Sequence, residues 1–398
     1  MEADPGPAPE FGLGDSSRLT RLVLTDFRNY QSLTWNVENR ISLITGPNGS
    51  GKTNLLEAVS LLVPGRGLRG ARMADLPRHG AVHWAVAARL RSAGETFEIG
   101  TGTVADSQAG RRVFRLDGQP VRNRNEIAQR LSAVWLTPQM DRLFIEGASG
   151  RRRFLDRLVL ALEPGHAREV AAHDEAMQGR NRLLSSGRPD ASWIGGLELS
   201  MARHAVAAAA ARRALVGRLN ARAAGREGDP GGDGFPAARL MLACPIAERL
   251  AHEPALAVED WLRAALAASR SADARTGGAS LGAHKADLLL SDIETGQQAS
   301  TASTGQQKAL LLGVVLAHAA LIGSLRGDAP LLLLDEPLVH LDATRRNALF
   351  TALAGLSSHV LMTGTDLEPF HPLEGLASHV GALQGRLLDA GSEAWKSL

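Results

Sequence analysis

One short segment constrains this chain more than any other. Residues 46–53 read Gly-Pro-Asn-Gly-Ser-Gly-Lys-Thr and match the pattern G-x-x-x-x-G-K-[ST] in full. A strand-like apolar run, residues 40–45, precedes the segment, and a helix-like run, residues 52–63, follows it. Glycines let backbone N–H groups approach phosphate oxygens, and the helix N-terminus adds a favourable dipole. The segment therefore predicts a loop that binds the phosphates of a nucleoside triphosphate.

Two side chains of this loop have specific roles. The Lys52 ammonium is expected to reach the β- and γ-phosphates, and the Thr53 hydroxyl is expected to ligate Mg²⁺. A glycine-rich turn that matches the pattern by chance is the alternative, and the flanking strand and helix disfavour it. We expect the nucleotide to be held by Gly46, Pro47, Asn48, Gly49, Ser50, Gly51, Lys52 and Thr53.

A second motif supplies two acids. Residues 331–334 are four consecutive leucines and read as a buried strand that ends at Asp335 and Glu336. In open α/β sheets the carboxyl end of such a strand faces the ligand. We expect Asp335 to hold Mg²⁺ through water, and Glu336 to orient or deprotonate the attacking water. The alternative is an acid pair before Pro337 that only complements a helix dipole.

A third motif, residues 303–308, reads Ser-Thr-Gly-Gln-Gln-Lys and precedes a helix expected from about Ala309. Ser303, Gly305 and Gln306 would form a second anion site at the start of that helix. Because one phosphate loop already serves one nucleotide, we interpret this motif as a contact to the nucleotide of a second subunit. An ordinary helix N-cap is the alternative.

The remaining segments differ in composition. Residues 19–27 read as a strand, and residues 82–121 read as a β-rich lobe with a hairpin turn at Asp117-Gly118. Residues 151–268 are rich in Ala, Leu and Arg at helical spacing, and residues 228–234 form a glycine-rich break within them. The pattern predicts a split α/β domain with a helical insertion.

We therefore expect four regions. The first is a disordered tail, because its sequence is acidic and rich in Pro and Gly and has no apolar core of a signal peptide. The others are an N-terminal part of the head, a helical arm and a C-terminal part of the head. The expected bounds are residues 1–17, 18–150, 151–274 and 275–398.

Composition limits what the chain can do. The net charge of +2 permits nucleic-acid binding without demanding it. Cys244 is the only cysteine, so no disulfide can form within the chain and a reducing cytoplasm is the natural compartment. The longest apolar run, residues 309–322, is too short to span a bilayer and contains His318, which predicts a buried helix and no membrane span.

Clusters of arginine are the candidates for contacts to DNA phosphates. The alternative is that they are solvated or form ion pairs within the chain, and the last cluster could equally cap the first helix of the arm. Only 4% of residues are aromatic, and single-strand binders stack bases on aromatic rings, so we expect a grip on duplex DNA. The clusters are Arg66, Arg69 and Arg72, then Arg111 and Arg112, then Arg151, Arg152 and Arg153.

In this order the motifs resemble those of ABC and SMC-head ATPases. Gln139 follows an apolar strand and is similar to the Gln of that class, and Asp342, after Leu341, is similar to its D-loop acid. The finer matches resemble the RecF family, from about Arg18 to Leu388. They are residues 27–30, which read Phe-Arg-Asn-Tyr, and residues 53–58, 65–69, 151–156 and 178–184.

The resemblance implies an α/β fold, an ABC/SMC-type ATPase head with a β-rich lobe and a helical arm. It implies ATP and Mg²⁺ as cofactors, with Lys52, Gln139 and Glu336 as catalytic residues and Gln139 also at the metal. It further implies an ATP-dependent homodimer with weak, DNA-stimulated hydrolysis. Such a dimer would clamp double-stranded DNA at single-strand gap junctions in the cytoplasm, associated with the nucleoid, and would support RecA loading with RecR and RecO.

Two segments depart from the expected patterns. Residues 282–287 read Gly-Ala-His-Lys-Ala-Asp, where the family often has Gly-Pro-His-Arg-Asp-Asp. Residues 363–366 read Thr-Gly-Thr-Asp where ABC transporters usually carry a switch His, so any γ-phosphate sensor here is a Thr. Two rival functions are an ABC transporter ATPase subunit, which a membrane partner would reveal, and a non-catalytic ATP-sensing scaffold, which would show no turnover.

Overall fold

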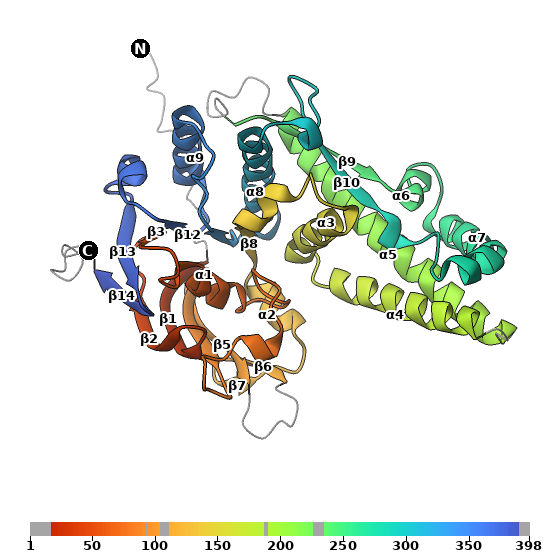
Figure 1. Cartoon of the computed structure of the whole chain (residues 1–398), viewed down its shortest axis with the longest axis horizontal. Helices are drawn as coiled ribbons and strands as arrows, with labels where there is room; N and C mark the ends of the chain where they lie inside the picture. The colour runs from red at the N-terminus through yellow and green to blue at the C-terminus, as the bar shows by residue number, and fades with distance from the viewer. Residues whose placement is uncertain (1–16, 93, 104–110, 187–189, 226–234, 390–398) are drawn as a thin grey trace, which may run out of the picture.

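The fold is described from a computed structural model, which places residues 17–92, 94–103, 111–186, 190–225 and 235–389. The expected tail, apart from Ser17, and the glycine-rich break at residues 228–234 lie outside the described residues. Figure 1 shows a rounded head that carries the first and last parts of the chain and an elongated arm that extends to one side. The arm is built from the middle of the sequence.

A six-stranded sheet forms the centre of the head. Its strand order is β14-β13-β3-β12-β11-β8, and all neighbours are parallel except β13 and β14. Strand β11 is buried on both faces, which explains its unbroken run of leucine. The strands are β3 (Ile41–Thr45), β8 (Ala133–Leu136), β11 (Leu331–Leu334), β12 (Val360–Gly364), β13 (Ala377–Leu383) and β14 (Arg386–Asp389).

A second, antiparallel sheet forms the β-rich lobe that the sequence predicts. Its strand order is β2-β1-β4-β5-β6-β7. The hairpin turn at Asp117-Gly118 is confirmed, since both residues have positive φ, as a two-residue turn of this kind requires. The strands are β1 (Arg18–Phe27), β2 (Tyr30–Asn36), β4 (Ala85–Ser92), β5 (Glu95–Thr103), β6 (Arg112–Leu116) and β7 (Gln119–Pro120).

Helix α1 (Lys52–Ser60) begins directly after the phosphate-loop segment. Its apolar side chains, among them Leu55, Leu56 and Val59, are fully buried in a core shared by the two sheets. A second core forms on the other face of the central sheet, where helices α8 and α9 pack. The head helices are α1, α2 (Asn125–Arg130), α8 (Thr304–Arg326) and α9 (Ala343–Gly355), with the short 3-10 turns η1 (Met73–Asp75), η2 (Pro138–Arg142), η4 (Ala299–Thr301) and η5 (Glu368–Leu373).

The arm is mainly helical, as the composition indicates, but it also contains a two-stranded antiparallel sheet. Strand β9 (Ala238–Ala243) pairs with β10 (Asp287–Asp292), and both lie along the longest helix (Figure 1). Strand β10 therefore pairs with the arm, although it lies after residue 274, where the arm was expected to end. The helices are α3 (Ala148–Leu162), α4 (His166–Ser185), α5 (Ala191–Ala224), α6 (Pro245–Arg249), α7 (Ala255–Thr276) and the turn η3 (Ala283–Lys285).

Helix α8 begins at Thr304, earlier than the expected start at Ala309. Ser303 caps it: the Ser303 hydroxyl accepts from the Gln306 N–H, and the Gln306 side chain accepts from the Ser303 N–H. This capping box extends the helix through polar residues that apolar periodicity does not reveal. By length and composition α8 could cross a membrane, but 67% of its most apolar window is buried, as expected for a core helix.

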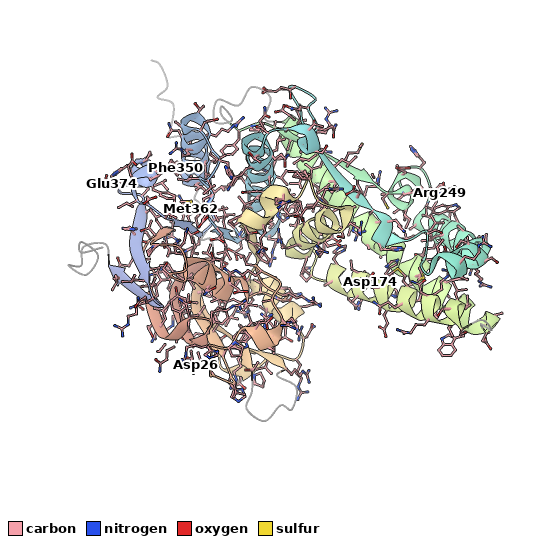
Figure 2. All side chains as sticks on the ribbon, viewed as in Figure 1. Asp26, Asp174, Arg249, Phe350, Met362 and Glu374 are labelled. Carbon is pink, nitrogen blue, oxygen red and sulfur yellow. The ribbon has the colours of Figure 1, made fainter. Side chains whose placement is uncertain are left out.

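The interior of the head is mainly apolar, and its exterior carries polar side chains. In Figure 2, Met362 on β12 and Phe350 on α9 lie within the head, whereas Asp26 and Glu374 lie at its edge and Arg249 lies on the outer part of the arm. Met362 is fully buried. The interior of the central sheet therefore provides a rigid support for the loops at the carboxyl ends of its strands.

Candidate nucleotide site

The phosphate loop connects β3 to α1 at the carboxyl end of the central sheet. Lys52 is buried, and its ammonium donates to the Gly46 and Pro47 carbonyls at 2.6 and 3.1 Å. Burial lowers the pKa of Lys52, and the carboxylates of Glu336, Asp335 and Asp366 act in the opposite direction. The Lys52 side chain is thus a desolvated cation that links the end of the loop back to its first two residues.

The loop leaves no room for larger residues at two glycines. A Cβ on Gly46 would lie 2.3 Å from the Ala382 carbonyl oxygen, and one on Gly51 would lie 2.4 Å from the Asn29 amide. Both glycines also have positive φ, at 147° and 111°. The close fit and the unusual backbone explain why glycine occupies these positions.

The Phe-Arg-Asn-Tyr segment, residues 27–30, joins β1 to β2 and forms hydrogen bonds to the phosphate loop. Asn29 Nδ2 donates to the Ser50 carbonyl at 3.1 Å, and the Tyr30 hydroxyl donates to the Gly51 carbonyl at 3.1 Å. Arg28 forms an ion pair at 2.8 Å with Glu57, which is buried in α1. Sequence reasoning used this segment only as a family resemblance and did not assign it to the loop. Nothing in its spacing indicates that β1 ends beside the phosphate loop.

Two of the three predicted metal residues, Thr53 and Asp335, contact each other. Asp335, at the end of β11, is buried and accepts from the Thr53 hydroxyl at 3.0 Å and from the Thr363 hydroxyl at 2.8 Å. Burial raises the pKa of Asp335, while the two hydroxyl donors lower it. A carboxylate and a hydroxyl side by side are hard oxygen donors, which suit Mg²⁺ bound together with substrate phosphates. The described residues contain no cluster of three His, Cys, Asp or Glu side chains that could hold a metal ion.

Glu336 follows in a conformation that few residues adopt. Its φ is 48°, its N–H donates to the Thr363 hydroxyl, and its carbonyl accepts from Lys308 Nζ at 3.0 Å. Lys308 is fully buried and also pairs with Asp141 at 3.2 Å. Left-handed backbone in a non-glycine residue costs free energy and is found often at functional sites. Sequence reasoning did not assign Lys308 or Asp141 to the site, because they are distant in sequence and only folding brings them together.

Gln139 lies on η2, directly after β8, and is exposed. Strand β8 is the neighbour of β11, and the Asp335 N–H donates to the Leu136 carbonyl at 3.0 Å. The carboxyl ends of these two strands therefore place Gln139 on the same side of the sheet as the acid pair. The pairing of Lys308 with Asp141 ties the Gln139 turn to the first turns of α8.

The signature residues occupy the start of α8, with Ser303 exposed. A Cβ on Gly305 would lie 2.7 Å from the His340 carbonyl oxygen, so the helix start packs against the loop that leads to α9. Asp342 caps α9, because its carboxylate accepts from the Arg345 N–H at 2.8 Å. The signature and the D-loop acid thus form one continuous surface of the head.

The arginine clusters differ in their surroundings. Arg112 is buried and donates to backbone carbonyls, including Gly65 at 2.6 Å. Arg151 forms a two-pronged ion pair with Asp287, and Arg152 donates to the Ala286 carbonyl. These contacts favour the alternative of intramolecular partners for those arginines. The exposed candidates are Arg66, Arg69, Arg72, Arg111 and Arg153. Two of them also have partners within the chain: Arg72 forms a bidentate ion pair with Asp75, and Arg69 donates to the Asn54 side chain at 3.0 Å.

The segment that departs from the family pattern, residues 282–287, lies at the base of the arm. His284 stacks on His173, and Asp287 receives Arg151. Gly282 has φ of 142°, and a Cβ there would lie 2.7 Å from the His173 ring. The retained His and final Asp thus hold the arm together, and Lys285 is exposed.

The class of protein follows from this geometry and from the fold. Three features define an ABC/SMC-type ATPase head. They are a phosphate loop after β3, an acid pair after β11, which is separated from β3 by one strand, and an inserted arm. The family model described as RecF/RecN/SMC N terminal domain matches residues 18–368. A solved structure of the recombination mediator protein RecF–ATPγS in the RecFOR pathway superposes with a TM-score of 0.82, at 21% identity, over 95% of this chain and 99% of that chain.

Curated relatives narrow the assignment. A DNA replication and repair protein RecF of Rhizobium etli is 45% identical over 93% of this chain and 98% of its own length. The RecF of Allorhizobium ampelinum is 45% identical over 94% of this chain and 100% of its own length. The chain belongs to the RecF family of DNA replication and repair proteins.

Proposed function

We propose that this protein is an ATP-gated DNA clamp that acts in recombinational repair at single-strand gaps. The observation that carries the proposal is the convergence of Lys52, Thr53, Asp335 and Glu336 at the carboxyl edge of one parallel sheet. A desolvated lysine that faces three carboxylates has the charge arrangement of a site for a metal–triphosphate complex. Related solved structures of RecF–ATP and RecF–ATPγS in the RecFOR pathway support ATP as the nucleotide.

The residues of the site divide the work. The backbone of residues 46–53 and the Lys52 ammonium would bind the phosphates. Thr53 and Asp335, with Gln139, would hold Mg²⁺, whose chemistry is to neutralise charge on the transferred phosphoryl group. Glu336 would take a proton from the attacking water, and its fixed backbone aims the carboxylate. The expected activity is slow hydrolysis of ATP to ADP and phosphate, stimulated by DNA.

Closure would require two heads. We propose that Ser303, Gly305 and Gln306 contact the ATP of a second copy, with Asp342 beside them. The exposed Ser303 and the helix N-terminus behind it support this role, because they offer hydrogen-bond donors to an anion. In the present structure the Gln306 Oε1 accepts from the Ser303 N–H in the capping box, so the Nε2 of the same amide would be the atom that donates to the partner's nucleotide.

A pair of inactive variants tests action in trans. Ser303→Arg is expected to bind ATP yet to block dimerisation, because a bulky cation would collide with the partner's nucleotide. Mixed with Lys52→Ala chains, it creates one composite site with an intact loop and an intact signature. Restored hydrolysis in the mixture supports trans action, whereas weak ATP binding by Ser303→Arg alone would contradict it.

For DNA we propose contacts from Arg66, Arg69 and Arg72, which follow α1 and are exposed. Arg153 remains a candidate on the arm, whereas Arg151 and Arg152 are candidates only if their internal contacts open. Duplex DNA is the expected ligand, because few aromatic side chains are present for base stacking. Downstream, RecR and RecO would bind the closed dimer in the cytoplasm, near the nucleoid, and support RecA loading.

We also propose residues 18–150 and 275–398 as the two parts of the head and residues 151–274 as the arm, with β10 joining the arm by pairing. Filter binding of matched duplex and single-stranded oligonucleotides across a salt series, with and without ATP, tests the clamp. We expect ATP-dependent binding to duplex DNA, without sequence preference, that weakens steeply with salt. Tight, salt-insensitive binding to single strands without ATP would contradict the proposal.

A further inference from the structure

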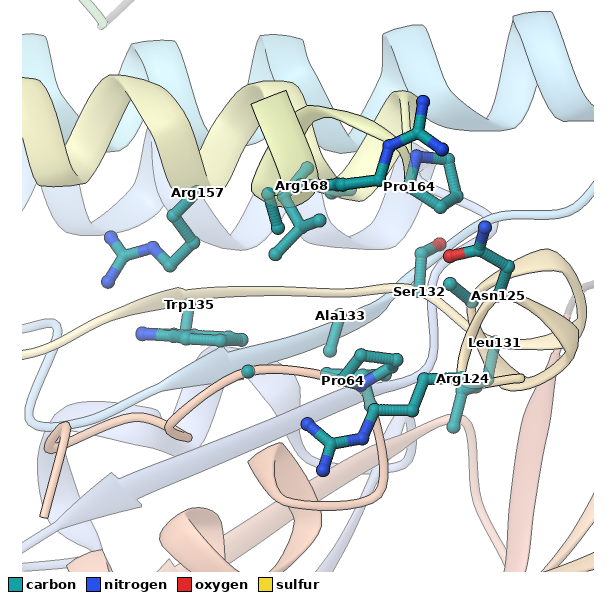
Figure 3. A pocket seen from close by; sticks show the side chains of 16 residues that line it. Pro64, Arg124, Asn125, Leu131, Ser132, Ala133, Trp135, Arg157, Pro164 and Arg168 are labelled. Atoms are coloured by element: carbon teal, nitrogen blue, oxygen red, sulfur yellow. The ribbon is translucent and has the colours of Figure 1, made fainter. Parts of the chain in front are cut away.

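A cavity of about 300 Å³ lies where the head meets the base of the arm (Figure 3). One wall is the segment after α1, with Pro64 and Gly65, and another is β8. The opposite wall comes from α3 and the start of α4, so an occupant would touch both the head and the arm. None of these residues belongs to the nucleotide site.

The cavity combines apolar walls with cations. Leu131, Ala133, Leu160 and Pro164 provide apolar surface. The side chains of Arg124, Arg157 and Arg168 stand around the cavity (Figure 3). Arg168 also pairs with the neighbouring Glu169 at 3.0 Å, in an exposed position, so a tail carboxylate would compete with Glu169 for it. The occupant that fits these walls has apolar side chains and several negative charges.

Arg157 has no carboxylate within ion-pair distance among the described residues. Its contacts are the Met140 sulfur at 3.4 Å and the rings of Trp135 and Phe154, with ring centroids at 4.8 and 5.4 Å. Burial lowers the pKa of Arg157 to about 10. A guanidinium in apolar surroundings without a counter-ion is unfavourable, so an anion in the cavity would stabilise it.

The wall formed by β8 also offers backbone groups that are not used in pairing with its one neighbouring strand, β11. This strand is an edge of the central sheet as described, and its ladder to β11 uses Ser132 and Leu136, which accept from Leu331 and Asp335. In a parallel ladder the intervening residues, Ala133 and Trp135, direct their N–H and C=O groups to the other side. The Trp135 indole N–H is also buried without an acceptor. An extended chain beside β8 would satisfy these groups.

The first described residue, Ser17, is held at the end of α8, and the last turn of α8 also contacts the cavity wall. Ser17 is fixed by two 2.6 Å hydrogen bonds to Asp328. Arg326 lies two residues before Asp328 in the sequence. Its guanidinium donates to the carbonyls of Ala161 and Ala128, which both line the cavity. Sixteen residues precede Ser17, and fully extended they reach roughly 50 Å.

The composition of residues 1–16 matches the cavity. They contain four acids, Glu2, Asp4, Glu10 and Asp15, and no Lys or Arg. They also contain Phe11 and Leu13, which follow a run of three alternating prolines, and such a run favours an extended backbone. Charge, apolar side chains and backbone preference are thus complementary to the arginines, the apolar walls and the free strand edge.

We propose that residues 1–16 bind in this cavity of their own chain, with their acids on Arg124, Arg157 and Arg168 and with Phe11 or Leu13 against the apolar walls. The bound tail braces the arm against the head. The proposal does not depend on nucleotide binding and is tested without ATP.

The rate of thiol labelling at the cavity measures occupancy. Ala167 is exposed and lines the cavity, whereas the natural Cys244 is buried, so Ala167→Cys in the full chain provides a single reactive thiol. The probe is Ellman's reagent. We expect labelling to become at least about tenfold faster when Phe11→Ser and Leu13→Ser are added. Ala210→Cys, exposed on α5, is the control thiol, and its rate should not respond to the tail.

Charge reversal identifies the contacts. Arg124→Glu with Arg168→Glu should also accelerate labelling about tenfold, whereas Arg203→Glu with Arg263→Glu, exposed elsewhere on the arm, should not. Changing the four tail acids to Lys should restore slow labelling in the first double variant. Equal rates with native and substituted tails would overturn the proposal. Slow labelling that disappears on dilution would overturn it too, because the tail would then bind a second copy.

Discussion

The phosphate loop and the base of the arm both present cations, but the two regions use them differently. Lys52 contacts only backbone carbonyls, with no carboxylate within ion-pair distance in the described chain. At the arm base, Arg212 forms a two-pronged ion pair with Asp156, and Arg151 forms one with Asp287. The first cation is arranged to receive a ligand, and the other two already have their partners.

The difference shows how to read a basic motif. A run of arginines in the sequence indicates phosphate binding or internal ion pairing equally well. The partner at close range decides between them, because a guanidinium already held by a carboxylate must break that pair before it can bind phosphate. The five predictions below test this contrast, from the largest expected effect to the smallest.

The largest effect is expected at the acid that faces Lys52. Glu336→Gln should lower the rate of ATP hydrolysis by about 100- to 10,000-fold, because the amide keeps the shape but cannot accept the proton. ATP binding and the closed dimer should persist, as size-exclusion chromatography with light scattering would show. Wild-type turnover in this variant would remove Glu336 from the mechanism.

At the arm base the loss should be one of stability. Arg212 is 2% exposed, and Arg212→Met should lower the free energy of unfolding by about 3 kcal/mol, because Asp156 is left without its main partner. Urea unfolding measures the change, with Arg203→Met, exposed on the same helix, as the control. ATP affinity should be unchanged. A strong fall in ATP affinity would contradict the view that Arg212 serves stability and not nucleotide binding.

At the phosphate loop the loss should be one of binding. Lys52→Ala should weaken ATP binding by at least about 100-fold, with little change in unfolding free energy, because the cation at the phosphates is removed. Isothermal titration calorimetry measures the affinity, and Lys285→Ala, exposed on the arm, is the matched control. Normal affinity in Lys52→Ala would contradict the assignment of the loop.

The support beneath the loop should have a smaller effect. Asn29 donates to Ser50 and accepts from Asn54, so Asn29→Ala should weaken ATP binding about five- to tenfold by loosening the loop. Asn347→Ala, exposed on α9, serves as the control in the same titration. An unchanged affinity would mean that the loop keeps its shape without this contact.

The smallest effect concerns two exposed arginines after α1 that have no carboxylate partner among the described residues. Arg66→Ala with Arg69→Ala should reduce the slope of log binding constant against log salt by up to about 2 for duplex DNA, one unit for each lost phosphate contact. Arg151→Ala should leave the slope unchanged, because its guanidinium is held by Asp287. The reverse result would place the DNA on the arm base.

Local patterns in the sequence were sufficient for several elements. The strand and helix on either side of residues 46–51, the leucine strand β11 and the Asp117-Gly118 turn each depend on a few adjacent residues, and each appears where the pattern predicts it. The start of α8 was misplaced by five residues, because a capping box extends a helix with polar residues that carry no apolar period. Helix ends are set by such single hydrogen bonds.

Tertiary structure alone decided which distant residues meet. The sequence by itself determined the chemistry available, namely a phosphate loop, an acid pair and a signature segment, because each is encoded in one short run. It could not show that Asn29 supports Ser50, that Lys308 holds the Glu336 carbonyl, or that Arg151 already pairs with Asp287. Those contacts join residues 21 to 136 positions apart. They depend on strand order and on the packing of the arm, which no local pattern specifies.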